Sequence, residues 1–271
     1  MAVEPVLEAA GLEVGFPDRD GALRRVLRGV SFRIHAGERV GLVGPSGCGK
    51  SLTTLAVLGL VPDPGRLLGG TVRVSGRDAS QVPDLRGGQI GLVLQEAASA
   101  LNPVYTVGFQ LTETLRAHGV AGGGDGRRAA LALLAEVALD PPQPIFAAYP
   151  HQLSGGQAQR VMLALALAGS PKVLLADEPT TALDVVTQAR VLELLVEITD
   201  RRRLGLLLVS HDLGLVSALV HRVLVMDDGA VVEEGAVADV FAAPSHPATR
   251  QLVEAARRRL DAHPAADGAP A

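Results

Sequence analysis

The chain has 271 residues, 48% of them apolar and 20% charged, a composition expected of a globular core that forms one large domain or two small ones. Its formal net charge of −4 excludes bulk electrostatic binding to nucleic acid or to anionic lipid. Its single cysteine, Cys48, excludes an intrachain disulfide or a cysteine-built metal cluster, which agrees with a reducing compartment.

The N-terminal segment MAVEPVLEAAGLEVG lacks the basic stretch and the apolar run of a secretion signal. Apolar runs elsewhere are short or are interrupted by charged residues and proline, so the sequence predicts no membrane-spanning helix. Any role at a membrane would therefore depend on partner proteins.

The chain contains two kinds of strand pattern. Alternating, turn-bounded segments at 12–16, 29–34 and 71–76 predict a small antiparallel sheet. Nearly continuous apolar runs are typical of buried parallel strands. They occur at 39–43, 89–94, 172–176, 204–210 and 221–226. Helical patterns lie between several of these runs, so we expect a doubly wound α/β core with the antiparallel sheet at its edge.

Residues 96–168 carry no convincing strand pattern and predict a helical insertion between two core strands. The glycine-rich stretch 121–126 predicts a flexible link between two of its helices. The helical patterns cover 108–118, 127–139 and 157–168.

The expected organisation is one domain over residues 1–261. Its core would comprise about 1–95 and 169–261, and its helical subdomain about 96–168. The small, proline-rich residues from about Ala262 onward predict a disordered tail over 262–271.

The stretch GPSGCGKS at 44–51 follows an apolar strand, precedes a helical run and matches the phosphate-binding pattern G-x-x-x-x-G-K-[ST]. Its glycines allow the backbone to wrap a polyphosphate with N–H groups inward. The chain has two lysines, Lys50 and Lys172. Lys50 would bring a compact charge to the terminal phosphates, and Ser51 would hold Mg²⁺. The ordinary alternative, a glycine-rich turn with a chance lysine, is disfavoured by the flanking strand and helix. The predicted nucleotide-binding residues are Gly44, Pro45, Ser46, Gly47, Cys48, Gly49, Lys50, Ser51 and Leu52.

Cys48 lies inside this loop, where we interpret it as a small filler. A helix N-terminus can lower the pKa of a thiol, and we expect that effect here. A bulky thiol reagent should then block nucleotide binding, and ATP should protect against it.

The run KVLLADEP at 172–179 predicts an apolar strand that ends in two acids. Asp177 suits a Mg²⁺ contact beside the phosphate loop. Glu178 can orient or deprotonate a water that attacks the γ-phosphate of a bound nucleotide. The ordinary alternative is an acidic turn after a strand, and the phosphate loop in the same chain favours the catalytic interpretation.

Gln95 and His211 follow the predicted strands 89–94 and 204–210. The carboxyl ends of parallel strands line the ligand crevice, and we expect both strands to lie beside the phosphate-loop strand. A lone Gln or His is usually structural. We nevertheless predict that His211 hydrogen-bonds the γ-phosphate and that Gln95 contacts Mg²⁺ or the attacking water.

The stretch LSGGQ at 153–157 stands before an apolar helical run. Ser154 and Gln157 have the spacing of a capping box, which would only start a helix. The alternative is that N–H groups at this helix N-terminus bind an anion. The stretch alone does not decide between the two.

The full set of motifs, in chain order, resembles the ATP-binding-cassette (ABC) ATPases over about residues 6–250. LSGGQ is the discriminating motif, because other phosphate-loop ATPases lack it. The resemblance implies an α/β fold: a P-loop NTPase (RecA-like) parallel-sheet core with an N-terminal antiparallel β subdomain and a helical insertion subdomain. The motifs are GPSGCGKS, Gln95, LSGGQ, LLADEP, TALD at 181–184, and His211.

The same resemblance implies a dimer that closes on two ATP molecules. The LSGGQ helix of one chain would bind the γ-phosphate of the nucleotide in the other chain's phosphate loop, so the capped helix would also be the anion site. Asp184 would couple the two sites, and Phe16 would stack on adenine. The family's signature residues correspond here to Ser154, Gly155, Gly156 and Gln157.

Three segments resemble the ATPases of dipeptide, oligopeptide and nickel importers: ALNPVYTVG at 100–108, YPHQLSGG at 149–156 and HPATR at 246–250. This implies a peripheral protein on the cytoplasmic face of the inner membrane, with two integral-membrane permease subunits contacted by the segment after Gln95. It also implies a second ATPase subunit, identical or related, and an extracytoplasmic solute-binding protein that acts indirectly. No nucleic acid is expected as a partner.

Alternatives to a peptide importer remain at this stage. Many peptide-importer members carry a cysteine-rich C-terminal extension that has no counterpart here, which favours nickel or metallophore uptake. The other possibilities are an exporter ATPase, a soluble ABC protein acting on ribosomes or DNA, and an inactive regulatory cassette. The segments ALNPVYTVG and HPATR disfavour the exporter. The single cassette and the lack of a long coiled-coil pattern disfavour a ribosome or DNA role, and the filled catalytic positions disfavour an inactive cassette.

Overall fold

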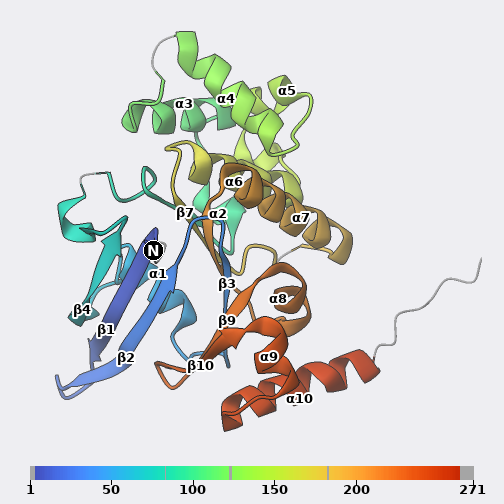
Figure 1. The fold of residues 1–271 in the computed structure, drawn as a ribbon. Coiled ribbons are helices and arrows are strands. Elements are labelled where there is room, and N and C mark those ends of the chain that lie inside the picture. Colours follow the sequence, from blue (N-terminus) through green and yellow to red (C-terminus); the bar gives the residue numbers. More distant parts are fainter. Residues whose placement is uncertain (1–3, 83, 122–123, 182, 263–271) are drawn as a thin grey trace, which may run out of the picture.

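The computed structural model describes residues 4–82, 84–121, 124–181 and 183–262 (Figure 1). Its central sheet has the strand order β10-β9-β3-β8-β7-β6. The strands β3, β6, β7, β8 and β9 are parallel, and β10 pairs antiparallel with β9. Their bounds are β3 (Arg39–Val43), β6 (Ile90–Val93), β7 (Val173–Asp177), β8 (Gly205–Val209), β9 (Arg222–Asp227) and β10 (Ala230–Ala236).

The structure confirms the five predicted core strands. Their sequences are continuously apolar because successive side chains alternate between two buried faces of the sheet. In β7, Leu174 and Ala176 belong to the apolar cluster on one face of the sheet, whereas Val173 and Leu175 belong to the cluster on the other. Because both faces are covered, every position is apolar, which produces the continuous runs seen in the sequence. The partly buried strand β10 has no such run, and the sequence pattern does not predict it.

One face of the central sheet is covered by helix α1 and the antiparallel sheet. That second sheet has the order β2-β1-β4-β5 and confirms the predicted N-terminal antiparallel subdomain. Helix α1 packs between the two sheets, in contact with β1, β2 and β7. The bounds are β1 (Leu7–Pro17), β2 (Leu23–Ile34), α1 (Lys50–Val57), β4 (Arg66–Val74) and β5 (Arg77–Asp78), followed by a 3₁₀ turn at Ala79–Gln81.

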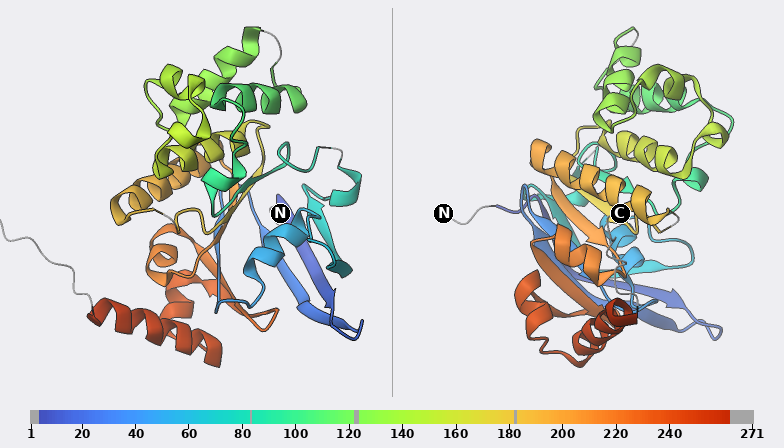
Figure 2. Two further views of the ribbon diagram at one scale, coloured as in Figure 1. Left: turned by 180° about the vertical axis from the view of Figure 1, so that it is seen from behind. Right: turned by 90° about the vertical axis from the view of Figure 1, so that its right-hand side faces the viewer.

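In the described residues between β6 and β7, the regular elements are all helices, joined by short loops. Helices α3, α4 and α5 pack on one another and form a lobe beyond the central sheet, which all three views show (Figures 1 and 2). The bounds are α2 (Ala97–Ala100), α3 (Val107–Ala117), α4 (Gly124–Glu136), α5 (Pro142–Ala147), a 3₁₀ turn at Pro150–Gln152, and α6 (Gly155–Leu167).

The predicted flexible link at 121–126 is wrong in its second half. Helix α4 already begins at Gly124, so Gly124–Gly126 form its first turn, while residues 122–123 lie outside the described residues. Asp125 stands in this first turn, where an acidic side chain interacts favourably with the positive end of the helix dipole. The two glycines therefore start a helix rather than separate two helices.

The remaining helices cover the other face and the far end of the core. In Figure 2, α10 lies at the end of the molecule opposite the α3–α5 lobe. Helix α10 extends to Ala262, and the rest of the predicted tail, residues 263–271, lies outside the described residues. No helix in the described part of the chain is both long enough and apolar enough to cross a membrane. The bounds are α7 (Val185–Arg202), α8 (Leu213–Leu219), α9 (Val237–Ala242) and α10 (Pro247–Ala262).

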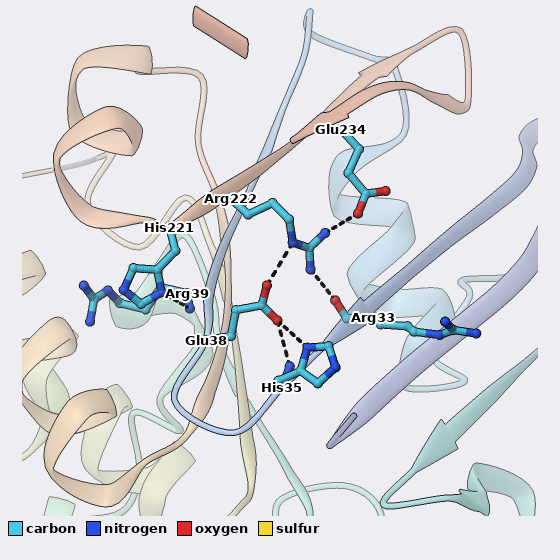
Figure 3. A network of polar contacts seen from close by, with 7 residues as sticks. All are labelled: Arg33, His35, Glu38, Arg39, His221, Arg222 and Glu234. Atoms are coloured by element: carbon cyan, nitrogen blue, oxygen red, sulfur yellow. Dashed lines mark hydrogen bonds and ion pairs between the residues drawn. The ribbon is translucent and has the colours of Figure 1, made fainter. Parts of the chain in front are cut away.

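A polar network centred on Arg222 ties the antiparallel sheet to the central sheet (Figure 3). The Arg222 guanidinium on β9 donates to Glu38 Oε1 at 2.8 Å and to the carbonyl oxygen of Arg33 on β2 at 2.6 Å. A further bond runs to Glu234 Oε1 on β10 at 2.5 Å. His35 donates its backbone N–H to Glu38 Oε2 at 2.8 Å. Because the network lies at the start of β3, it fixes the sheets at the end opposite the phosphate loop.

Candidate functional site

The phosphate loop joins β3 to α1, as the sequence predicts. Two of its glycines are required by packing and by backbone conformation. A Cβ atom on Gly44 would lie 2.3 Å from the carbonyl oxygen of Met226, so the loop can pass β9 only with glycine there. Gly49 has φ 107°, a conformation that side-chain-bearing residues rarely adopt, and it leads directly into α1.

Lys50 is the first residue of α1, and its ammonium group lies under the loop. Only 7% of the residue is exposed, and Nζ donates to the carbonyl oxygens of Gly44 at 2.9 Å and Pro45 at 3.0 Å. The cation is therefore held inside the curve of the loop. The other lysine, Lys172, precedes β7 at the opposite end of the sheet and donates to Ser75 Oγ at 3.0 Å, so it is separate from the site.

The expected lowering of the Cys48 pKa is wrong. The Cys48 side chain is 6% exposed, and a Cβ atom on Gly44 would lie 2.8 Å from its Sγ. Burial raises the pKa of the thiol, because a buried site disfavours the thiolate, and this outweighs the nearby positive charge of Lys50. The interpretation of Cys48 as a small filler agrees with this position.

Ser51 and Asp177 meet beside the loop. Ser51 Oγ donates to Asp177 Oδ1 at 3.1 Å, which joins the first turn of α1 to the end of β7. Burial raises the pKa of Asp177, and the negative charge of Glu178 adds to this, while the bond from Ser51 works against it. A hydroxyl and a carboxylate form an oxygen-only set that suits Mg²⁺, an ion that takes its other ligands from phosphates and water. The described residues hold no group of three or more His, Cys, Asp or Glu side chains suited to a metal.

Glu178, the next residue, is the centre of a second polar cluster. His211 Nδ1 lies 3.1 Å from Glu178 Oε1, and Gln95 Nε2 donates to Oε2 at 3.3 Å. Thr181 Oγ1 also donates to Oε2, at 2.9 Å. Burial favours the neutral acid, but the bonds from His211 and Thr181 outweigh it and lower the pKa of Glu178. The carboxyl group is therefore ionised at neutral pH.

The structure thus brings Glu178, His211 and Gln95 together, but not by the predicted strand order. Strand β8, which precedes His211, does pair with β3. Strand β6, which precedes Gln95, lies at the sheet edge, with β7 and β8 between it and β3, so the expectation that it adjoins β3 is wrong. Gln95 reaches the site because its strand pairs with β7, which carries Asp177.

The capping box predicted for α6 is confirmed. Ser154 Oγ accepts from the backbone N–H of Gln157 at 3.3 Å, and Gln157 Oε1 accepts from the N–H of Ser154 at 2.9 Å. The glycines between them have a packing role that the sequence analysis missed. A Cβ atom on Gly156 would lie 2.5 Å from Thr187 Cγ2, and one on Gly155 would lie 3.1 Å from Leu183 Cδ2.

The start of α6 and the Glu178 segment share a cleft of about 240 Å³. Gln95, Gly155, Pro179 and Leu183 are among the residues that line it. Asp184, the residue after Leu183, caps α7, because its Oδ1 accepts from the N–H of Thr187 at 3.0 Å. Gly155 of the signature stretch and the catalytic candidate Gln95 therefore border one cavity, whereas Glu178 and His211 line a neighbouring one.

Phe16 lies on the antiparallel sheet, away from the Glu178 cluster. It pairs with Arg24 across β1 and β2 and is partly buried. A Cβ atom on Gly65 would lie 2.6 Å from its ring, so the loop at Gly65 packs directly against Phe16.

The fold and this geometry define a phosphate-loop nucleotide-binding protein. A family model described as "ABC transporter" matches residues 27–181. The chain belongs to the ABC transporter family, and it is an ATP-binding ATPase of that family.

The relatives of known sequence point to one branch of the family. The chain is 42% identical over 255 residues to the dipeptide transport ATP-binding protein DppD of Escherichia coli (strain K12), covering 92% of this chain and 78% of that protein. It is 41% identical to DppD of Haemophilus influenzae, covering 92% of this chain and 76% of that one.

A solved structure agrees in fold. The ATP-binding cassette MJ0796, in a dimeric post-hydrolysis state with ADP and Pi, superposes with a TM-score of 0.73 at 29% identity. The match covers 85% of this chain and 98% of that chain.

Proposed function

We propose that this chain is the ATP-hydrolysing motor subunit of a peptide importer. The observation that carries the proposal is the Glu178 cluster beside the Ser51–Asp177 pair, since it offers an ionised acid next to a magnesium-type oxygen set at the end of the phosphate-loop sheet. The choice of peptide as the solute is supported by the identity to the dipeptide transport proteins.

ATP is the substrate, and each part of the loop has a task in holding it. The backbone N–H groups of residues 44–52 and the Lys50 ammonium bind its phosphates. Ser51, Asp177 and Gln95 are the residues that would hold Mg²⁺, which neutralises phosphate charge during transfer. Glu178 orients the attacking water and accepts its proton, and His211 holds the Glu178 carboxylate and bonds the γ-phosphate.

A second cassette, identical or related, completes each site in this proposal. Ser154 and Gly155 at the start of α6 are exposed, and a helix N-terminus attracts phosphate. Gly156 and Gln157 complete that anion site, and Asp184 would couple the two sites. Phe16 would stack on adenine. The dimeric state of MJ0796 with ADP and Pi supports a paired arrangement.

The α3–α5 lobe offers a surface for two integral-membrane permease subunits. Large apolar side chains are exposed there, with Val104 at 69%, Phe109 at 45% and Tyr149 at 40%. Tyr105 and Phe109 stack with ring centroids 4.5 Å apart, which presents a rigid aromatic surface. Docking there would place the chain at the cytoplasmic face of the inner membrane, where the helical subdomain at about 96–168 moves against the core. An extracytoplasmic binding protein would deliver the solute.

Uptake by cells tests this function. Cells in which this chain is deleted would be complemented with the wild type, Lys50→Ala or Glu178→Gln. The uptake of labelled dipeptide, labelled oligopeptide and ⁶³Ni²⁺ would then be compared between these strains. We expect only the wild type to restore peptide uptake. Restoration of nickel uptake instead would assign the solute to a metal, and unchanged uptake of all three solutes in the deletion would contradict an importer.

A further inference from the structure

Thr181 has no assigned role, yet it makes the shortest hydrogen bond to the Glu178 carboxylate among its three donors. Its hydroxyl lies 2.9 Å from Glu178 Oε2, compared with 3.3 Å for Gln95 and, at the other oxygen, 3.1 Å for His211. Gln95 and His211 come from other strands. Thr181 is therefore the one donor of the three whose position is fixed within the same turn as the carboxylate.

The turn that carries Thr181 is held at both ends. The N–H of Glu178 donates to the carbonyl oxygen of Val209 on β8 at 3.0 Å, so the residue is anchored to the sheet. Glu178 itself has φ 45°, a conformation uncommon for a residue with a side chain, which bends the chain away from β7. The N–H of Thr181 donates to the carbonyl oxygen of Glu178 at 3.4 Å, which closes the turn from Glu178 to Thr181.

The two adjacent threonines have different environments. Thr180 is 6% exposed and packs into the protein, whereas Thr181 is exposed. An exposed threonine contributes little packing, so its contact with Glu178 is a polar one that depends on the hydroxyl.

We propose that Thr181 is a positioning residue for Glu178: its hydroxyl fixes carboxylate oxygen Oε2, leaving His211 to hold Oε1. A carboxylate tethered at both oxygens cannot rotate, so it presents one fixed face to a water. Thr181 does not touch substrate in this account and acts only through Glu178. The inference deepens the proposed role of Glu178 and rests on it.

A matched pair of variants separates the hydroxyl from the rest of the side chain. Thr181→Val keeps the shape and removes the donor, whereas Thr181→Ser keeps the donor and removes the methyl group. We expect Thr181→Val to lower kcat for ATP hydrolysis by about tenfold, the scale for losing one hydrogen bond to a charged group. Its KM and its equilibrium Kd for a fluorescent ATP analogue should stay within about twofold of wild type, and Thr181→Ser should keep at least half of the wild-type kcat.

A double variant shows whether Thr181 acts through Glu178. Adding Thr181→Val to Glu178→Gln should leave the residual rate unchanged, because the group that it positions is already absent. Its ATP Kd should also match that of Glu178→Gln alone.

The inference is wrong if Thr181→Val keeps the wild-type kcat, if Thr181→Ser is as slow as Thr181→Val, or if Thr181→Val slows the Glu178→Gln protein further. These outcomes differ from failure of the proposed function. Near wild-type turnover by Glu178→Gln alone would remove Glu178 from its role, whatever Thr181 does.

Discussion

At the scale of single residues, the proposed chemistry would depend on two neighbouring acids whose pKa values are shifted in opposite directions. The pKa of Asp177 is raised by burial, whereas that of Glu178 is lowered by its hydrogen-bond donors despite burial. Cation binding to Asp177 would favour its ionised form. The lowered pKa keeps Glu178 ionised, which is the state that its proposed role as proton acceptor requires.

Replacing Glu178 by Gln should separate binding from hydrolysis. The amide keeps the shape of the side chain but cannot accept the proton, so we expect steady-state hydrolysis to slow by about 100-fold or more. ATP affinity should remain close to wild type, because the phosphate loop is untouched. Phosphate release measured beside equilibrium ATP binding checks this, and a rate within about threefold of wild type would contradict the assignment.

The buried thiol of Cys48 should react slowly. Its raised pKa and its contact with the phosphate loop both oppose attack, so at neutral pH we expect a bulky disulfide reagent to label it more slowly than it labels a free cysteine. Any labelled protein should lose ATP binding, because the adduct would displace the loop. Mass spectrometry over time, beside a nucleotide-binding assay, measures both effects. Labelled protein that binds ATP with unchanged affinity would disprove the predicted loss of ATP binding.

Motif spacing could predict Asp177 and Glu178, because a buried strand with acids at its end has a clear pattern. Motif spacing could not predict the contact of Thr181 with Glu178, since a hydroxyl in a turn has no periodic sequence pattern. It also missed why Gly156 must be glycine. That reason is the approach of Thr187 from another helix, a tertiary contact 31 positions along the chain.

At the scale of elements, the Arg222 network should contribute to stability. Arg222 and Glu38 are 19% and 18% exposed, so removing one partner leaves the other charge poorly solvated. We expect Arg222→Ala to lower the free energy of unfolding by about 1–3 kcal/mol. Arg222→Ala combined with Glu38→Gln should cost less than the sum of the single changes. Urea unfolding of the four proteins tests this, and strict additivity would argue against the network.

Glu233 fastens helix α10 to β10 and should make stability depend on pH. Partial burial opposes its ionisation, but the backbone N–H groups of Ser245 at 2.8 Å and His246 at 2.9 Å, together with the side chains of Thr249 and Ser245, outweigh this. They lower its pKa to about 2, from an ordinary value of 4.5. A lowered folded-state pKa stabilises the protein above the unfolded pKa, so this contribution is complete above pH 4.5 and is lost as the pH falls toward 2.

Glu233→Gln removes that titration. The wild type should exceed it in unfolding free energy at pH 7, and the difference should shrink as the pH falls through 4.5. Urea unfolding at several pH values between 7 and about 3.5 measures the difference. A difference that stays constant over that range would show that Glu233 is not titrating as described.

Continuous apolar runs could predict the five parallel strands, because both faces of the sheet are buried. They could not predict strand order, since every buried run looks alike, and this is why β6 was expected beside β3. The half-buried β10 and the helix start at Gly124 have weak patterns for a similar reason: neither carries a long apolar stretch.

At the scale of the whole molecule, two regions with different surfaces are joined through α6, which contacts α3 and α4 of the lobe and β6 of the central sheet. The core supplies the phosphate loop and the acids, while the α3–α5 lobe carries exposed aromatic side chains such as Phe109. The cleft lined by Gln95, Gly155 and Leu183 lies between the catalytic residues and the start of α6. In the proposed function, a change at the nucleotide would reach the lobe through Gln95 and α6.

The most direct test of the importer proposal is to capture the membrane proteins that bind this chain. Tagged Glu178→Gln protein would be purified from native membranes with Mg²⁺ and ATP, and the co-purifying chains would be identified by mass spectrometry, with Lys50→Ala as the control that should not bind ATP. The account predicts two multi-span membrane proteins, with or without a second cassette chain. Recovery only from the soluble fraction, together with ribosomes or DNA, would contradict the importer and leave the ATPase chemistry without a transport role.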